Sequence, residues 1–550
     1  MNSEKNEQEF RIKIPMIAAA ESLIGLEFSG PHRELMLKGV DENLSKYEEI
    51  RALNMPNDVI PVLYFDPRLP GMTFNTKKKP IRISNVPDIA VPNNLEELAF
   101  SSILNLASLI SKQKISSLDL TRMYLSRLKR YNSLLNCVIT LTEDLALKQA
   151  KRADEEIKRG KYRGLLHGIP YGVKDLFAYP GYLTTWGAMP YKDQIIDQTA
   201  TVLKRLEQAG AVMIAKLSMG ALAWGDVWFR AKTKTPWNLE EGSSGSSAGS
   251  ASATAAGLVA FSIGTETWGS IISPSTRCGT TGLRPTYGRV SRHGTMTVSW
   301  SMDKIGPICR TVEDCAIIFD VLYGPDGQDM TLVDFPFNWN AELNATSLRV
   351  GYDQKAFEES KYYEEHPDAK VNDAATLEKM RSIGFQIKPI DLPDFPSDAL
   401  SILLFAEVAA AFDDLTLTKR DELLVRQEED AWPNVFRQAR MIPAVEYIQA
   451  NRARYLLIQA MARLFTEVDV YVAPSFSRSL LLTNLTGHPA VVVPNGFTEK
   501  GMPTSITFIG DLYKEAETLL VAKYYQDATE HHEKKPPLQE VKNVNLEQDQ

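Results

Sequence analysis

The stretch from Gly245 to Gly282 constrains the fold of this chain more than any other segment. It begins with a loop rich in glycine and serine, continues through an alanine-rich segment and an apolar run, and ends in a second turn, reading GSSAGSASATAAGLVAFSIGTETWGSIISPSTRCGTTG. A flexible linker has a similar composition, but it is not followed at once by small, closely packing side chains and an apolar strand. We therefore expect a buried helix and strand here, with Ser246 and Ser270 on the two loops that bracket them.

The second turn, Thr267 to Ser270, follows the apolar run LVAFSI. Backbone N–H groups of such a turn can converge on one point and bind a developing oxyanion. A turn with a purely structural role is the alternative. We predict that Ser247, Thr267, Trp268 and Gly269 contact a substrate.

Lys174 lies upstream of both loops, in HGIPYGVKD. An exposed lysine has a pKa of about 10.4 and is a poor base at neutral pH. The apolar and glycine residues beside Lys174 favour burial, and burial favours the uncharged amine. We therefore predict a catalytic role for Lys174, against the alternative of a surface Lys-Asp pair with Asp175.

Composition indicates an ordinary globular protein and excludes several function classes. Of 550 residues, 44% are hydrophobic, and the net charge of −8 does not favour nucleic acid as a partner. The four cysteines form no CxxC pair and the seven histidines show no HxH or HExxH spacing, so neither a disulfide framework nor a metal site is expected. No apolar run is long enough to span a membrane. The polar start predicts a cytoplasmic protein, or a secreted or periplasmic one if a signal peptide was removed.

The pattern along the chain predicts an α/β fold, a large mixed β-sheet core covered by helices on both faces. Apolar runs alternate with helical patterns, and six of these runs are expected to be strands: 169–173, 212–215, 258–263, 348–352, 468–472 and 490–493. We expect residues 1–94 to be an N-terminal extension, made of a helix around 35–53 and a proline-rich strap over 56–92. Residues 95–533 would form the main domain, and 534–550 a disordered tail.

Together with GLRPTYGRVSRHG at 282–294 and SMDKIGPICRTVEDCA at 301–316, these motifs resemble the amidase signature family of serine hydrolases. The resemblance spans roughly residues 96–530 and implies the fold of that family. It further implies that Ser270 is the nucleophile, Ser246 a bridging acid/base next to an unusual cis peptide, and Lys174 the ultimate base. No metal or organic cofactor is implied. The expected partner is a small-molecule amide, and the oligomeric state stays open, with a homodimer as one option.

Three positions near the nucleophile depart from the family pattern Thr-Asp-Thr-Gly-Gly-Ser-Ile-Arg: Glu266, Trp268 and Ile272. If the family uses a positive φ where Trp268 stands, this turn must differ. The Trp268 indole either lines the pocket for the acyl group of the substrate or fills the protein core. Ile272 removes a positive charge, and we therefore expect an apolar or aryl amide substrate.

Several alternatives remain. Ser247 lies in a G-x-S-x-G sequence and has Asp469 and His488 downstream in the order of an α/β-hydrolase, but the preceding residues do not form a buried strand. The A subunit of a tRNA-dependent amidotransferase shares the family fold and releases ammonia from glutamine. An esterase or carbamate hydrolase would use the same site, and a non-catalytic binding protein would be expected to lack one of the three reacting groups.

Overall fold

The computed structural model describes residues 10–53, 55–57, 59, 61, 63–86 and 88–538. Its centre is a mixed sheet of eleven strands in the order β1-β3-β2-β6-β8-β7-β12-β13-β11-β9-β10, and β4 and β5 form a separate pair. The strands are β1 Val138–Leu141, β2 Pro170–Lys174, β3 Val212–Leu217, β4 Lys234–Thr235, β5 Asn238–Gly242, β6 Phe261–Glu266, β7 Thr281–Arg284, β8 Lys304–Cys309, β9 Val350–Asp353, β10 Ile387–Ile390, β11 Val470–Pro474, β12 Ala490–Phe497 and β13 Pro503–Gly510.

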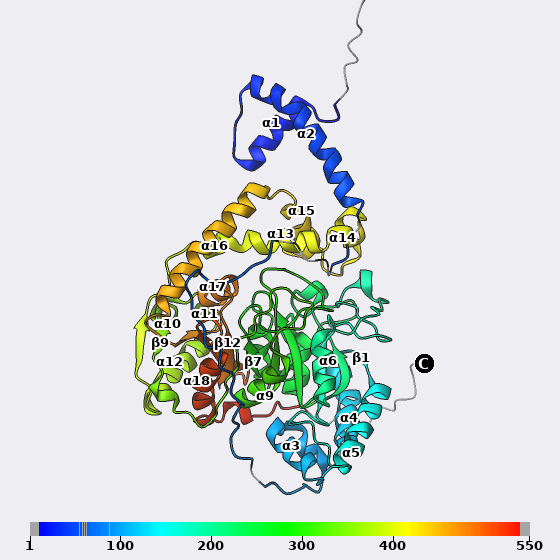
Figure 1. The fold of residues 1–550 in the computed structure, drawn as a ribbon, viewed down its shortest axis with the longest axis vertical. Helices are drawn as coiled ribbons and strands as arrows, with labels where there is room; N and C mark the ends of the chain where they lie inside the picture. The colour runs from blue at the N-terminus through cyan, green and yellow to red at the C-terminus, as the bar shows by residue number, and fades with distance from the viewer. Residues whose placement is uncertain are drawn as a thin grey trace, which may run out of the picture.

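Helices cover this sheet, and the arrangement can be followed in Figure 1. The α-helices are α1 Ile14–Ile24, α2 Gly30–Arg51, α3 Ile103–Ser111, α4 Ser117–Leu135, α5 Glu143–Lys158, α6 Thr201–Gln208, α7 Ala248–Ala255, α8 Ile272–Cys278, α9 Val312–Leu322, α10 Gln354–Glu359, α11 Tyr362–Glu365, α12 Pro367–Ser382, α13 Ile402–Ala411, α14 Asp413–Leu417, α15 Trp432–Ala439, α16 Ala444–Leu464, α17 Arg478–Thr486 and α18 Glu515–Asp527. Short 3₁₀ helices are Leu95–Phe100, Met189–Tyr191, Ala221–Ala223, Ala345–Ser347, Ser397–Ser401, Arg420–Leu423 and His531–Glu533.

The central strands are buried on both faces. Every residue of β2, β3, β8, β11 and β13 is buried, which requires packing partners above and below the sheet. The predicted α/β fold is therefore confirmed. Each of the six predicted strands overlaps an observed one. The run from 258 begins as a strand only at Phe261, because Gly257 turns the chain with a φ of +64° after α7.

The N-terminal residues form a helical hairpin that projects from the body of the molecule (Figure 1). Arg33 joins α2 to Glu21 of α1 through an ion pair of 2.6 Å. The sequence pattern indicated one helix here; α2 begins earlier than expected, and α1 was missed. The described residues of the strap form no helix or strand, and aromatic side chains hold it. Phe65 packs edge-on against Tyr287, with ring centres 5.0 Å apart.

The C-terminal segment packs on the main domain beyond residue 533, where the sequence predicted a disordered tail to begin. Lys534 lies over the ring of Phe497 and Lys535 over that of Phe100, so the tail expected from residue 534 packs on the domain at least through these positions. The remainder of the predicted tail, 539–550, lies outside the described residues.

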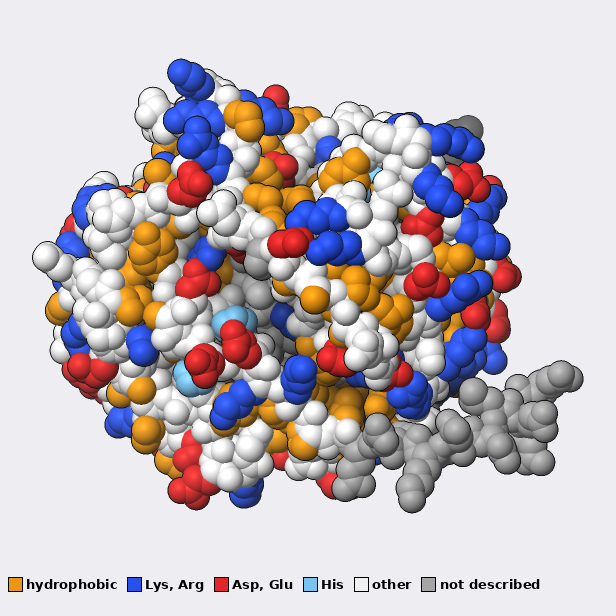
Figure 2. Space-filling view, turned by 90° about the horizontal axis from the view of Figure 1, so that it is seen from below, with side chains coloured by type: hydrophobic (Ala, Val, Ile, Leu, Met, Phe, Trp, Pro, Cys, Tyr) orange, Lys and Arg blue, Asp and Glu red, His pale blue; other side chains and the backbone are white. Residues whose placement is uncertain are grey.

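The surface is mixed in charge. Acidic and basic side chains are interspersed over the face shown in Figure 2. Among the described residues, no helix combines the length and apolar character needed to cross a bilayer.

Two glycines provide a matched test of the sheet packing. A methyl group on Gly306 in β8 would lie 1.9 Å from the Leu283 carbonyl oxygen, whereas one on Gly39 in α2 would meet nothing within 4 Å. Overpacking a core costs about 1–3 kcal/mol, while Gly to Ala in an exposed helix contributes roughly 0.5–1 kcal/mol of stability. We expect Gly306→Ala to lower the melting temperature by calorimetry and Gly39→Ala not to lower it. Equal effects would contradict the packing of β7 against β8.

Candidate active site

Lys174 is the last residue of β2 and is fully buried. Its Nζ lies 2.7 Å from Ser246 Oγ, 2.9 Å from Thr265 Oγ1 and 3.2 Å from Ser247 Oγ. Burial lowers the pKa of Lys174 from 10.5 to about 7, although the carboxylates of Asp303 and Glu266 act in the opposite direction. A neutral amine has two N–H groups and one lone pair, so one of the three hydroxyls donates to nitrogen. A hydroxyl that donates to Lys174 Nζ can pass its proton to the amine.

The neighbouring buried lysine, Lys216 of β3, has a different environment. Its Nζ lies 2.9 Å from the carboxylate of Asp175, and both side chains are fully buried. Among the described residues Lys174 has no ion-pair partner. The two side chains therefore differ in chemistry: Lys216 belongs to an ion pair, and Lys174 is an amine surrounded by hydroxyl groups.

Ser246 is held beside Lys174 by the loop before α7. The Gly245–Ser246 peptide bond is cis, as the family resemblance implied. Gly245 is required because a Cβ there would lie 1.8 Å from the carbonyl oxygen of Gly225. Ser246 is only 1% exposed, so its hydroxyl is shielded from bulk water.

Ser270 lies on the turn between β6 and α8 and is 8% exposed, more than Lys174 or Ser246. Its carbonyl accepts a hydrogen bond of 3.2 Å from the Ser247 N–H, which joins the two loops. No hydrogen bond of the Ser270 hydroxyl is present in the described part of the chain. A relay through Ser246 therefore requires a closer approach of the two hydroxyls; catalytic hydrogen bonds often tighten only when a substrate binds.

The turn that carries Ser270 is fixed by two buried carboxylates. Thr267 Oγ1 donates to Asp303 Oδ1 at 2.6 Å. Glu266 Oε2 accepts the N–H groups of Ile271 and Ile272 at 2.9 and 3.0 Å. Burial alone would raise the pKa of Glu266, but the Arg284 guanidinium at 2.8 Å and these amides hold it below its usual value.

The backbone donors of this turn are available to a ligand. Within the described residues, the N–H groups of Trp268, Gly269 and Ser270 have no acceptor. Gly269 has a φ of +88°, in the left-handed region that favours glycine, whereas Trp268 does not. The substitution at Trp268 therefore leaves the turn unstrained. The indole is 40% exposed, so it does not fill the core.

Ser247 behaves differently from the prediction. Its side chain is fully buried, and its hydroxyl donates to the Thr265 carbonyl oxygen (3.1 Å) and accepts the Thr265 N–H (3.2 Å). These bonds engage the hydroxyl within the protein. The geometry thus favours a structural role beside Lys174 over contact with a substrate.

The alternative α/β-hydrolase triad is not assembled. The hydroxyl of Ser247 is bonded to Lys174 and Thr265, Asp469 pairs with Arg349, and the His488 Nδ1 lies 2.8 Å from Thr486 Oγ1. Burial lowers the pKa of His488 to about 3. In the described residues, no group of three His, Cys, Asp or Glu side chains is suited to hold a metal ion.

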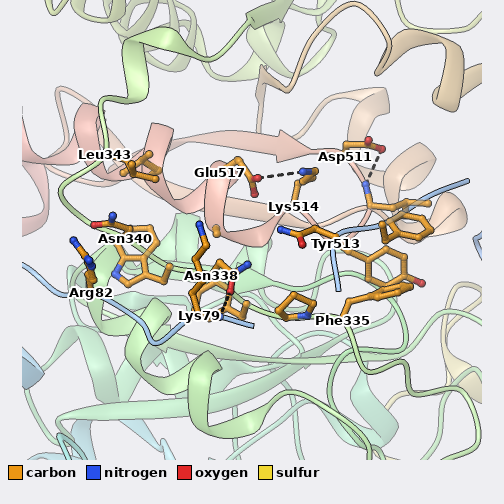
Figure 3. Close-up of a pocket in the computed structure, with 18 of the residues that line it drawn as sticks. Lys79, Arg82, Phe335, Asn338, Asn340, Leu343, Asp511, Tyr513, Lys514 and Glu517 are labelled. Carbon is orange, nitrogen blue, oxygen red and sulfur yellow. Dashed lines mark hydrogen bonds and ion pairs between the residues drawn. The ribbon is translucent and has the colours of Figure 1, made fainter. Parts of the chain in front are cut away.

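Among the described residues, two cavities of several hundred Å³ flank the domain. One of about 970 Å³ is lined by Trp186, Tyr191, Trp300, Tyr447 and the alanines of α13. None of the three reacting residues lines it; the Trp186 N–H donates to the carbonyl oxygen of Asp175, the residue after Lys174. The other, of about 660 Å³, lies between the strap and residues 511–520 and is not lined by any of the three reacting residues (Figure 3).

Sequence reasoning missed two residues of this site. Thr265 contacts Lys174, and Asp303 holds Thr267; both stand within the motifs that carry the family resemblance. The apolar run before it predicted the strand that carries Thr265, but no local pattern indicated that Lys174 of the neighbouring strand would contact it. Asp303 had no local signal, because its partner comes from a distant turn.

The buried amine makes stability depend on pH. Burial lowers the pKa of Lys174 from 10.5 in the unfolded chain to about 7 in the folded one, so between these pH values the unfolded chain binds more protons. The contribution of Lys174 to stability therefore rises as pH increases from 7 to 10.5. At pH 7 we expect Lys174→Met to melt at a higher temperature than the wild type. As pH rises to 10.5, the wild type should gain stability and this difference should shrink. A constant difference would contradict the lowered pKa.

Comparison with known proteins agrees with this geometry. The family model "Amidase" matches residues 119–482. The A subunit of glutamyl-tRNA(Gln) amidotransferase from Marinomonas sp. (strain MWYL1) is 34% identical over 486 residues, covering 80% of this chain and 98% of that one. The corresponding protein from Methylococcus capsulatus is 33% identical over 485 residues, with 79% and 98% covered.

Solved structures share the fold. Native peptide amidase from Stenotrophomonas maltophilia superposes with a TM-score of 0.70 at 27% identity, over 80% of this chain and 99% of that one. A bacterial aryl acylamidase of the amidase signature family has a TM-score of 0.68 at 21% identity, over 79% and 98%. The match to the family model covers well over half of the chain, and the curated relatives exceed 30% identity. The chain therefore belongs to the amidase signature family, a family of hydrolases that act on carbon–nitrogen bonds.

Proposed function

We propose that the protein hydrolyses an amide through an acyl-enzyme on Ser270, with Ser246 and Lys174 as a proton relay. The observation that carries the proposal is the 2.7 Å contact between Ser246 Oγ and a buried amine whose pKa is lowered to about 7. Such an amine is a base at neutral pH, and the hydroxyl between it and the nucleophile is protected from water.

The steps follow from these positions. The Ser270 proton passes to Ser246 Oγ as the Ser246 proton passes to Lys174 Nζ, and Ser270 Oγ forms a bond to the amide carbon. The free N–H groups of Trp268, Gly269 and Ser270 would stabilise the oxyanion. The relay returns the proton to the leaving nitrogen as the C–N bond breaks. Water then attacks the ester by the same route and releases the acid.

An apolar or aryl amide is the first candidate substrate. The apolar Ile272, two residues after Ser270 where the family pattern has arginine, supports it. An ester or carbamate would react by the same steps.

The second candidate is the A subunit of a tRNA-dependent amidotransferase, which takes ammonia from glutamine. The curated relatives support it more strongly than they support a generic amidase, because they carry that name and almost their whole length is aligned. This function would require partner subunits and a cytoplasmic location. The homodimer predicted from the sequence stays a prediction.

The proposed relay predicts the pH dependence of catalysis. Only the neutral form of Lys174 accepts a proton, so kcat/KM should rise about tenfold per pH unit below 7 and level off above it. Lys174→Arg, which remains protonated, should remove nearly all activity. A profile without an inflection between pH 6 and 8 would contradict the role of Lys174 as the base.

Ser270→Ala tests the nucleophile. We expect a loss of at least a thousandfold in kcat on any amide that the wild type cleaves, with the same circular dichroism spectrum. Ser273→Ala is a matched control, because Ser273 lies three residues on, at the start of α8, and its hydroxyl is bonded to Ser244 at 2.6 Å. Retained activity in Ser270→Ala would end the proposal.

A substrate panel separates the two candidates. Purified alone, the protein should cleave aryl or alkyl amides faster than free glutamine if the first candidate is right. Glutamine turnover that depends on added amidotransferase partner subunits, with no cleavage of aryl amides, would favour the second.

A further inference from the structure

The loop from Thr297 to Asp303 connects the catalytic turn to more distant parts of the chain. At one end, Asp303 Oδ1 accepts the Thr267 hydroxyl at 2.6 Å, while its Oδ2 accepts the N–H groups of Val298 and Ser299 at 2.8 and 3.1 Å. The position of Asp303, and with it Thr267, therefore depends on where the start of this loop lies.

A residue of the N-terminal strap holds that start. The Asn57 side-chain oxygen accepts the Thr297 N–H at 2.7 Å, and its amide nitrogen donates to the Thr297 carbonyl oxygen at 3.0 Å. The same nitrogen donates to the carbonyl oxygen of Ala411, at the end of α13, at 3.2 Å. One side chain thus binds both backbone groups of Thr297 and ties them to α13.

Helix α13 contacts the same loop a second time. Its Glu407 carboxylate accepts the hydroxyls of Ser299 at 2.6 Å and Ser301 at 2.7 Å. The strap contacts it again as well: Phe65 lies under the Arg454 guanidinium at 3.6 Å, and Arg454 donates to the Ser301 carbonyl oxygen at 2.9 Å. Asn57 is the point at which the strap, the loop and α13 meet.

We propose that Asn57 is a positioning residue for catalysis, acting through Thr297 and Asp303 on Thr267 and the backbone donors beside it. The proposal rests on the proposed function, since it assigns those donors to the oxyanion. It gives the N-terminal extension a part in catalysis through its strap, which packs on the body, while its α1–α2 hairpin projects away from it (Figure 1). Donors that stabilise a transition state must be held in place before the reaction, and small displacements reduce the rate without changing substrate binding.

The test is Asn57→Ala, compared with Asn75→Ala on the same strap. Asn75 is exposed, and among the described residues its side chain bonds only the Lys77 N–H two residues on. We expect Asn57→Ala to lower kcat by about 10- to 100-fold with KM changed less than twofold. Asn75→Ala should match the wild type. Equal kcat values for the two variants would overturn the proposal.

Two further readouts separate positioning from general loosening. If Asn57→Ala loosened the packing around the active site, Lys174 would be hydrated, and the inflection of the kcat/KM profile would move from about pH 7 towards 10.5. If Asn57 only positions Thr267, the inflection stays near pH 7. In a Thr267→Val background, Asn57→Ala should cost less than twofold in kcat, because the link is already broken. A raised inflection, or an undiminished loss in that background, would overturn the proposal.

Two variants keep the result interpretable. If Asn57→Ala does not fold, Asn57→Asp retains the acceptor for the Thr297 N–H but loses both donated bonds, and its kcat should still fall at unchanged KM. Ser270→Ala identifies the failure of the proposed function itself. If Ser270→Ala is inactive and Asn57→Asp is fully active, the inference alone is wrong.

Discussion

The site depends on an amine that is buried without a counter-ion. Lys174 meets three hydroxyl groups, while Lys216 on the adjacent strand meets the carboxylate of Asp175. Moving a charged amine out of water is costly unless an opposite charge compensates it, so the uncharged form of Lys174 is favoured and its pKa falls to about 7. A carboxylate in direct contact would favour the protonated amine and so oppose the loss of its proton, as Asp175 does for Lys216, whose pKa burial nonetheless lowers.

The sheet places this amine and holds its surroundings rigid. Lys174 stands at the end of β2, next to β6, whose end leads into the turn with Ser270. At the end of β6, just before that turn, Glu266 forms an ion pair with Arg284, and both side chains are fully buried. Asn484 of α17 donates to the same Glu266 carboxylate at 2.8 Å. The Glu266 carboxylate is thus occupied by these groups, and in the described part of the chain the N–H groups of Trp268, Gly269 and Ser270 have no acceptor.

Local patterns predicted much of this arrangement. Local backbone conformation could be predicted for the apolar run before Lys174, the small residues of α7 and the glycine at position 269. The family motifs supplied the roles of Ser246 and Ser270. Long-range contacts were not predictable in this way. The bond between Thr267 and Asp303, and that between Asn57 and Thr297, join segments that no periodicity relates. The strands β7, β8 and β13 were missed as well, since proline and glycine interrupt their apolar pattern.

Covalent labelling at controlled pH tests the central claim most directly. A fluorophosphonate reacts only with an activated serine hydroxyl, and peptide mass spectrometry identifies the residue modified. We expect a single adduct on Ser270, formed at a rate that rises with pH and reaches half its maximum near pH 7, where Lys174 loses its proton. An adduct on Ser247, or a labelling rate on Ser270 that is constant from pH 6 to 9, would contradict it.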